Sequence, residues 1–210
     1  MKSLKIKVCG MKYPENIDAL VQLNPDFIGF IFYPPSKRFI GLDFEKQFLK
    51  NIPSEIIKTG VFVNATLPEV VEFGKLYGMK AIQLHGQETP QFCEELRIAG
   101  FKVIKAFGID ENFDFEDLLP YQNHVDLFLF DTKTVLYGGS GETFSWQILD
   151  NYKIDKPFLL SGGISLANLD QVLAIKNANL HGIDINSRFE IEPGLKDIEL
   201  LKMAFKKIKK

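Results

Sequence analysis

The chain has 210 residues, of which 46% are apolar and 25% are charged, and its formal net charge is −2. This length supports one well-developed hydrophobic core, so we expect a single domain over residues 1–210. The nearly balanced charge offers no field that would attract nucleic acid or an anionic membrane, and no stretch approaches the roughly 18 apolar residues of a membrane span.

The two cysteines, Cys9 and Cys93, lie far apart and match neither a CxxC pair nor a zinc pattern. A disulfide framework is therefore not expected, which fits a reducing cytosol. The N-terminal residues Met1-Lys2-Ser3 lead directly into a short apolar segment that contains two lysines, unlike a signal peptide. We therefore expect a cytoplasmic protein.

Short apolar runs typical of β-strands recur along the chain, with starts roughly 20–30 residues apart. Two of them, 27–32 and 125–130, are nearly continuous apolar runs, as in strands buried on both faces of a parallel sheet. The expected strands are Leu4–Cys9, Asp26–Phe32, Ile56–Val63, Lys80–Leu84, Lys102–Phe107, Val125–Phe130, Pro157–Leu160 and Gly182–Ile185.

The segments between these runs carry helix signals. Proline, threonine or serine marks several helix starts, and glycine marks several helix ends. The expected starts are Pro14, Pro68, Thr89, Ser165 and Asp197, and two expected ends are Gly78 and Gly100. We also expect helices near 44–50 and 113–119, where the apolar periodicity is weakest.

Eight strands that alternate with roughly eight helices predict a parallel α/β fold. A closed barrel requires eight such units, whereas an open doubly wound sheet usually uses five or six, so the count favours a single-domain (βα)8 TIM barrel. A chain of 210 residues is short for this fold, so its loops must be short.

In such a barrel the active site lies at the carboxyl ends of the strands. The polar or glycine residues expected there are Cys9, Arg38, His85, Asp131, Gly162, Gly163, Asp184, Asn186 and Ser187. Together they indicate an acid–base site beside an anion site. Taken singly, each has a plainer interpretation: a buried apolar-like thiol for Cys9, a loop cap for Asp131, or a solvated loop charge for Arg38.

Gly162-Gly163 follows the seventh expected strand, and Asn186-Ser187 follows the eighth. Loops in these two positions often form a phosphate cradle, because glycine lets backbone N–H groups approach the anion. The alternative is that Gly162-Gly163 is only a tight turn. Another cluster, Gly138-Gly139-Ser140-Gly141, lacks the lysine of a P-loop and is interpreted as a surface loop or a lid.

The chain resembles the phosphoribosylanthranilate isomerases in eight segments that occur in the same order over nearly its whole length. These segments are Lys7-Val8-Cys9-Gly10; Gly29-Phe30-Ile31-Phe32 with Ser36-Lys37-Arg38; Gly60-Val61-Phe62-Val63-Asn64; Gln83-Leu84-His85-Gly86; Phe130-Asp131-Thr132; Gly138-Gly139-Ser140-Gly141 with Phe144 and Trp146; Ser161-Gly162-Gly163; and Gly182-Ile183-Asp184-Ile185-Asn186-Ser187 with Glu190, Pro193-Gly194 and Lys196-Asp197.

The resemblance implies an Amadori rearrangement in tryptophan biosynthesis without cofactor or metal. N-(5-phosphoribosyl)anthranilate becomes 1-(2-carboxyphenylamino)-1-deoxyribulose 5-phosphate. By analogy Asp131 is the general acid that protonates the ring oxygen, and Cys9 is the general base that removes the C2 proton. The resemblance also implies that Arg38 binds the anthranilate carboxylate and that His85 and Asp184 line the pocket near the ribose and the amine. The phosphate is expected to be bound by Gly162, Gly163, Asn186 and Ser187.

These roles set a requirement on two pKa values. Asp131 would need a raised pKa to be protonated at neutral pH, and Cys9 a lowered one to be a thiolate. The chain also departs from the family pattern, since Lys37 stands where proline is common, Lys12 where threonine is common, and Arg188 where a small residue is common.

Other functions remain open at this point. Another phosphosugar barrel is the nearest, although an epimerase metal site would want more than His85 at the strand ends. A non-catalytic phosphoribosyl-ligand binder would not need both Cys9 and Asp131, and a redox sensor would need a partner thiol for Cys9. The expected partner is a small-molecule phosphoribosyl substrate, and the expected state is a monomer or homodimer.

Overall fold

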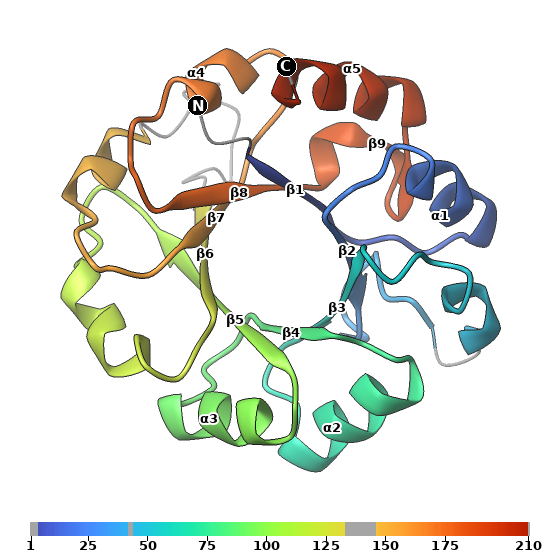
Figure 1. The fold of residues 1–210 in the computed structure, drawn as a ribbon, viewed down its shortest axis with the longest axis horizontal. Coiled ribbons are helices and arrows are strands. Elements are labelled where there is room, and N and C mark those ends of the chain that lie inside the picture. The colour runs from blue at the N-terminus through green and yellow to red at the C-terminus, as the bar shows by residue number, and fades with distance from the viewer. Residues whose placement is uncertain (1–3, 42–43, 133–145, 210) are drawn as a thin grey trace.

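The protein is described by a computed structural model over residues 4–41, 44–132 and 146–209. Eight parallel strands close into a barrel in chain order, inside an outer ring of helical segments (Figure 1). The strands are β1 (Lys5–Val8), β2 (Phe27–Ile31), β3 (Ile57–Phe62), β4 (Ala81–Leu84), β5 (Lys102–Ile109), β6 (Leu127–Thr132), β7 (Phe158–Ser161) and β8 (Leu180–Ile185). All eight strands expected from the sequence are confirmed.

The outer ring combines α-helices with 3-10 segments. The α-helices are α1 (Pro14–Val21), α2 (Leu67–Leu76), α3 (Pro90–Ile98), α4 (Leu169–Leu173) and α5 (Ile198–Ile208). The 3-10 segments are η1 (Lys46–Leu49), η2 (Phe115–Tyr121), η3 (Trp146–Asn151) and η4 (Ser187–Phe189). Gly78 and Gly100 have positive φ after α2 and α3, which confirms both as helix ends.

Three expectations about the helices need correction. The segments near 44–50 and 113–119 are 3-10 turns rather than α-helices. Pro120 lies inside η2, where it has no N–H to continue an α-helical ladder, and η1 is only four residues long. The helix after β7 begins at Leu169 and not near Ser165, because the Asn168 side chain accepts the N–H of Ser165 at 2.8 Å and holds a turn there.

A short antiparallel hairpin follows η4 and was not expected from the sequence. Its strands are β9 (Glu190–Glu192) and β10 (Leu195–Lys196), which are too short to show an alternating pattern. The hairpin lies beside α1 in the outer part of the fold (Figure 1). It carries two charged side chains, Glu190 and Lys196, that reach the mouth of the barrel.

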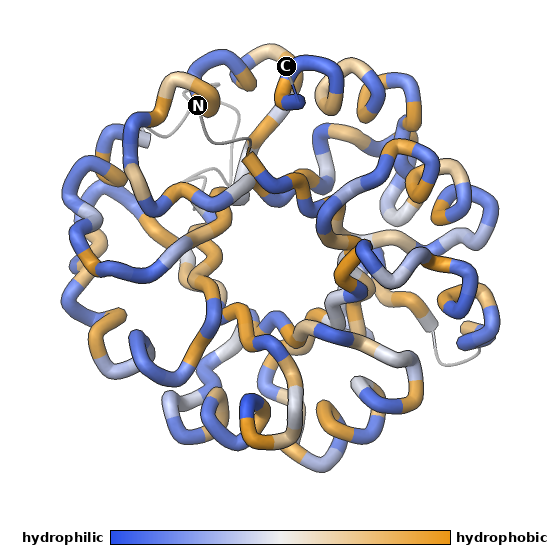
Figure 2. Tube along the Cα trace, viewed as in Figure 1, coloured by the Kyte–Doolittle hydropathy of each residue, from blue (hydrophilic) through white to orange (hydrophobic). Residues whose placement is uncertain are grey.

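Alternation along the strands divides the apolar residues into two groups. Side chains such as Ile6 and Val8 of β1 pack outward against the helical ring in the main core. A smaller cluster from the opposite strand face fills the barrel: Phe27, Ala81, Ile104, Ala106, Leu127, Leu129 and Leu159. Figure 2 shows apolar stretches along the inner ring, while the outer helices alternate between apolar and polar residues.

The barrel closes between its first and last strands. Lys7 lies opposite Asp184 and Val8 opposite Ile185 in the parallel pairing of β1 with β8. Gly182 is needed for this approach, because a Cβ at its position would lie 2.2 Å from the carbonyl oxygen of Lys5. Closure therefore brings the first and last strands of the barrel together.

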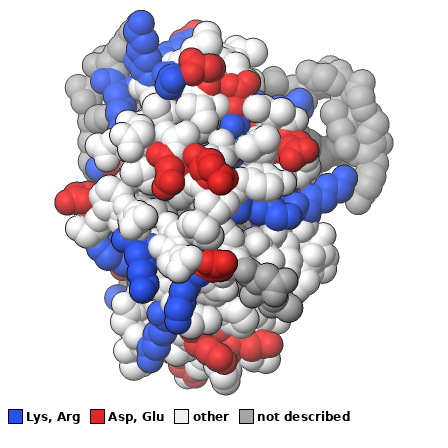
Figure 3. All heavy atoms as spheres, turned by 90° about the vertical axis from the view of Figure 1, so that its right-hand side faces the viewer, with Lys and Arg blue, Asp and Glu red and all other residues white. Residues whose placement is uncertain are grey.

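The surface shows both signs of charge. On the face drawn in Figure 3, Lys and Arg side chains are interspersed with Asp and Glu. Over the described residues, no helix has the length and apolar character needed to cross a membrane.

The start of α5 provides a test of local stability. The Asp197 carboxylate accepts the N–H of Leu200 at 3.0 Å and caps this helix. We expect Asp197→Ala to lower the free energy of unfolding by about 1 kcal/mol in urea denaturation, because one N–H loses its acceptor. Asp197→Asn keeps an acceptor oxygen and should remain close to the original stability; an equal loss in both variants would contradict the cap.

Candidate active site

A thiol, an ammonium and a carboxylate form the buried, innermost part of the site. Cys9 follows β1 and is 4% exposed, and its sulfur lies against Gly29 of β2, where a Cβ would approach Sγ to 2.7 Å. Lys7 lies two residues earlier on the same strand face and is fully buried. Its Nζ donates to Oδ2 of Asp184 at 2.7 Å.

The sequence interpretation missed Lys7. The only signal was the alternation of lysine with apolar residues in β1, which marks Lys7 as facing the barrel interior together with Cys9. Asp184, which was expected to line the pocket, lies on β8 opposite Lys7. One of its oxygens, Oδ1, is buried and has no hydrogen-bond partner among the described residues.

Burial dominates the electrostatics of the thiol. Burial raises the pKa of Cys9; the charge of Lys7 opposes this, Asp184 adds to it, and Lys196 opposes it. The direction is therefore opposite to the lowered pKa that a role as thiolate base requires. Burial also acts to lower the pKa of Lys7, but the attraction of Asp184 and Cys9 outweighs it, so the pKa is raised and Lys7 stays an ammonium.

Asp131 lies at the carboxyl end of β6, between Gly108 of β5 and Ser161 of β7. Oδ2 of Asp131 is 3.5 Å from Nε2 of His85, which follows β4. The two side chains are 36% and 35% exposed, so a ligand at the barrel mouth can reach both. The partly exposed carboxyl and imidazole groups and the buried thiol thus lie at the same end of the barrel.

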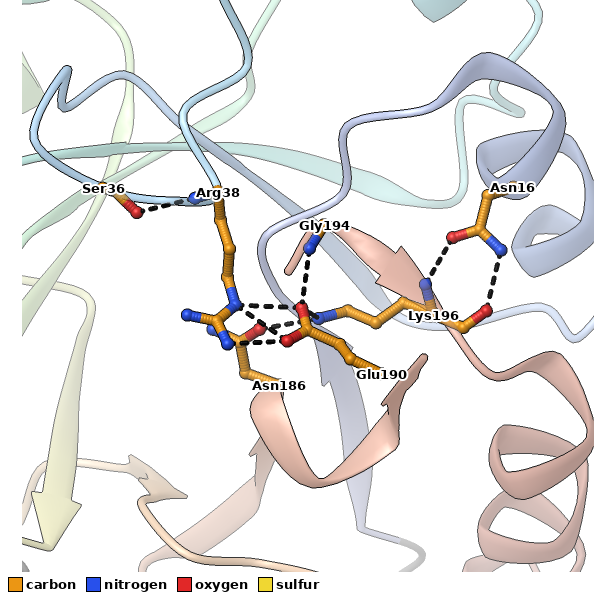
Figure 4. A network of polar contacts seen from close by, with 7 residues as sticks. All are labelled: Asn16, Ser36, Arg38, Asn186, Glu190, Gly194 and Lys196. Atoms are coloured by element: carbon orange, nitrogen blue, oxygen red, sulfur yellow. Dashed lines mark hydrogen bonds and ion pairs between the residues drawn. The ribbon is translucent and has the colours of Figure 1, made fainter. Parts of the chain in front are cut away.

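A second buried network surrounds Glu190 of the hairpin (Figure 4). Arg38 donates Nε to Oε1 of Glu190 at 2.9 Å and Nη2 to Oε2 at 2.6 Å. Lys196 donates Nζ to Oε1 of Glu190 and to Oδ1 of Asn186, both at 2.6 Å. Burial acts to raise the pKa of Glu190, but the hydrogen bonds from Arg38 and Lys196 outweigh it, so the pKa is lowered.

Arg38 is therefore not a solvated loop charge. The turn after β1 depends on the same network, because Gly10 has a φ of +76° and a Cβ there would lie 2.7 Å from Cδ of Arg38 and 3.0 Å from Oδ1 of Asn186. Glu190 and Lys196 belonged to the segments of family resemblance, but the sequence interpretation gave them no place in the site. They reach the site because the β9–β10 hairpin, which the sequence did not predict, allows Glu190 to pair with both Arg38 and Lys196.

The two loops expected to bind phosphate follow β7 and β8, which are neighbours in the barrel. Gly162 and Gly163 have φ values of +85° and +64°, a conformation that favours glycine. Nδ2 of Asn168 donates to the carbonyl oxygen of Gly163 at 2.9 Å and fixes this turn. In the next loop Asn186 uses its side-chain oxygen for Lys196, while Ser187 opens η4.

A buried ion pair also supports the loop that carries His85. Glu88 accepts the N–H of Gly86 at 3.0 Å and that of Asn64 at 2.8 Å. Lys105 lies 3.3 Å from Glu88 and donates to the carbonyl oxygen of Gly86 at 2.8 Å. Both backbone polar groups of Gly86, which directly follows His85, are thus held by one ion pair: the N–H by Glu88 and the carbonyl oxygen by Lys105.

The remaining expectations concern the second cysteine, metals and the glycine cluster. Cys93 lies in α3 on the outside of the barrel, and burial raises its pKa to about 12, so it is neither reactive nor a partner for Cys9. Both cysteines are free. Among the described residues no group of three or more His, Cys, Asp or Glu could hold a metal ion. The Gly138–Gly141 cluster and Phe144 lie outside the described residues.

Comparisons with known proteins show which family this chain is similar to. The family model for N-(5'phosphoribosyl)anthranilate (PRA) isomerase matches residues 6–207. A relative from Parabacteroides distasonis, named N-(5'-phosphoribosyl)anthranilate isomerase, is 47% identical over 97% of this chain and 92% of its own. The crystal structure of phosphoribosyl anthranilate isomerase from Thermotoga maritima has a TM-score of 0.85 at 33% identity over 98% of both chains. Another, solved in complex with reduced 1-(o-carboxyphenylamino)-1-deoxyribulose 5-phosphate, has a TM-score of 0.83 at 29% identity over 98% of both.

The raised pKa of Cys9 predicts slow, alkaline-shifted alkylation. Only the thiolate reacts with iodoacetamide, so its rate at Cys9 should still be rising at pH 9. Peptide-resolved mass spectrometry separates Cys9 from Cys93. A rate that levels off below pH 8 would contradict a thiol governed by burial.

The Lys105–Glu88 pair predicts strong coupling. Glu88→Gln should lower the free energy of unfolding by about 3 kcal/mol, because it leaves a buried ammonium without its counter-charge. The double variant Glu88→Gln/Lys105→Met removes that uncompensated charge and should recover part of the loss in urea denaturation. Simple addition of the two single effects would show that the groups do not interact.

Proposed function

The chain belongs to the N-(5'-phosphoribosyl)anthranilate isomerase family, and from this premise we propose that Cys9 is its general base and Asp131 its general acid. It is an isomerase of tryptophan biosynthesis. The residue roles are supported above all by the placement of Cys9 after β1 and Asp131 on β6, both at the carboxyl end of the barrel. Asp184 lies near both, since Asp131 contributes to the electrostatic surroundings of Asp184 and Asp184 contributes to those of Cys9.

Ring opening requires a proton on the furanose oxygen. In this proposal Asp131 donates that proton as the C1–O bond breaks, which leaves a Schiff base on the substrate and a carboxylate on the protein. His85, 3.5 Å away, can then donate Nε2–H to that carboxylate. The partial exposure of both side chains supports this role, because the acid must touch the sugar.

Isomerisation next requires a base at C2. The Cys9 thiolate takes the C2 proton, and the electron pair moves toward the Schiff-base nitrogen to give an enolamine. Tautomerisation of the enolamine yields the ketone, and exchange with solvent returns Asp131 and Cys9 to their starting protonation states. A positioned acid or base contributes typically 10²–10⁴ in rate, so two such groups account for a large share of the acceleration.

The substrate's two anionic ends fit two parts of the mouth. We assign the phosphate to the loops of Gly162-Gly163 and Asn186-Ser187, with backbone N–H groups and the Ser187 hydroxyl as donors, since the Asn186 side chain is engaged by Lys196. We assign the anthranilate carboxylate to Arg38. The bidentate contact with Glu190 holds the Arg38 guanidinium in one orientation before the ligand arrives.

This proposal predicts that Cys9→Ser and Asp131→Asn each lower turnover by at least about 10², because each removes a proton-transfer group while leaving the phosphate loops in place. The assay follows the loss of anthranilate fluorescence with substrate generated in situ. Binding of a phosphate-bearing product analogue, measured by calorimetry, should remain nearly unchanged.

Cys93→Ala provides the matched control, since it removes the other thiol of the chain at a site outside the barrel. Its turnover should equal that of the unmodified protein. Undiminished turnover in Asp131→Asn would remove the assignment of the acid, and undiminished turnover in Cys9→Ser would remove that of the base.

A further inference from the structure

Lys7 is the most deeply buried charge near the reacting groups and has no part in the steps above. We propose that Lys7 is a positioning residue, whose ammonium stabilises the Cys9 thiolate and holds the sulfur toward the substrate. This inference rests on the proposed function, in which Cys9 is the base. It explains why a lysine occupies a fully buried place inside the barrel.

The geometry places Lys7 beside the thiol. The two side chains project from the same face of β1, two residues apart, and both are buried, so the Lys7 ammonium acts to lower the pKa of Cys9. An ammonium has three N–H donors, of which one goes to Oδ2 of Asp184 at 2.7 Å. Asp184, opposite Lys7 in the β1–β8 pairing, therefore fixes the direction in which Lys7 meets Cys9.

The charges around Cys9 support an anionic sulfur. The groups that face it are Lys7 on β1, Arg38 after β2, Asp184 on β8 and Lys196 on β10. Glu190 joins this set through its contacts with Arg38 and Lys196. Three cations against two carboxylates leave one positive charge in a poorly hydrated space. Ionisation of the single thiol makes this group neutral.

Lys7 is better placed than the other two cations to act on sulfur. Arg38 and Lys196 both direct their N–H groups to the Glu190 carboxylate, and Lys196 also donates to Asn186. Of these three cations, Lys7 has the largest effect in lowering the pKa of the thiol. When Cys9 ionises, its proton leaves to solvent and Lys7 keeps all of its own. The thiolate then takes the C2 proton as described above.

The test replaces Lys7 by methionine and measures two quantities. The pH midpoint of Cys9 alkylation by iodoacetamide should rise by about one unit or more, which is a tenfold or greater loss of thiolate at neutral pH. Turnover at pH 7 should fall by the same factor. Lys5→Met is the matched control: it lies on the same face of β1, but Lys5 is half-exposed and pairs with Asp26 at 2.7 Å. It should change neither quantity.

Two further variants guard against a failure to fold, because Lys7→Met leaves Asp184 buried without its cation. Asp184→Asn keeps Lys7 and removes the anion, so the alkylation midpoint should fall below that of the unmodified protein. Lys7→Met/Asp184→Asn buries no charge at either position and should have a midpoint above that of the unmodified protein, since Lys7 affects the thiol more strongly than Asp184 does.

The outcomes separate this inference from the proposed function. An unchanged midpoint in Lys7→Met, or a midpoint in the double variant at or below that of the unmodified protein, would overturn the role of Lys7. A raised midpoint with unchanged turnover would support Lys7 as the cation that stabilises the thiolate and would remove Cys9 as the base. A raised midpoint with a matching loss of turnover supports both.

Discussion

Pairing of β1 with β8 closes the barrel and places Lys7 opposite Asp184, although 177 positions separate them in the chain. Gly182 makes this possible, because any side chain there would meet the backbone of β1. Once the strands pair, the N–H of Cys9 donates to the carbonyl oxygen of Ile185 at 3.0 Å, and the turn at Gly10 follows. The thiol, its buried cation and the start of the loop after β8 therefore depend on one strand contact.

Buried charges determine how the barrel is organised near the carboxyl ends of its strands. The lower interior is filled by apolar side chains, whereas three lysines near the mouth are almost fully buried and each has a carboxylate: Lys7 with Asp184, Lys105 with Glu88, and Lys196 with Glu190. An unpaired charge in such a place would be costly, so each pair constrains two loops to one arrangement. The stability of the mouth and the orientation of its functional groups thus have the same physical origin.

The hairpin of β9 and β10 extends this arrangement to the rim. Asn16 of α1 donates to the carbonyl oxygen of Lys196 at 2.9 Å and accepts its N–H at 2.8 Å, so the hairpin is tied to the first helix. Through Glu190 the same hairpin holds Arg38, which comes from the loop after β2. Groups from three distant parts of the chain are therefore oriented before a ligand binds, which reduces the entropy lost on binding.

The barrel was predictable from the sequence, because eight apolar runs at regular spacing already determine the strands, and the thiol, acid and glycine turns stand at their ends. Local patterns could not distinguish 3-10 turns such as η2 from α-helices. They also did not reveal Lys7, Glu88, Lys105, Glu190 or Lys196 as parts of the mouth. A lysine in a strand looks alike whether it faces solvent, as Lys5 does, or a buried carboxylate, as Lys7 does. Only barrel closure decides between these environments, because it determines which charges are removed from water and which partners they meet there.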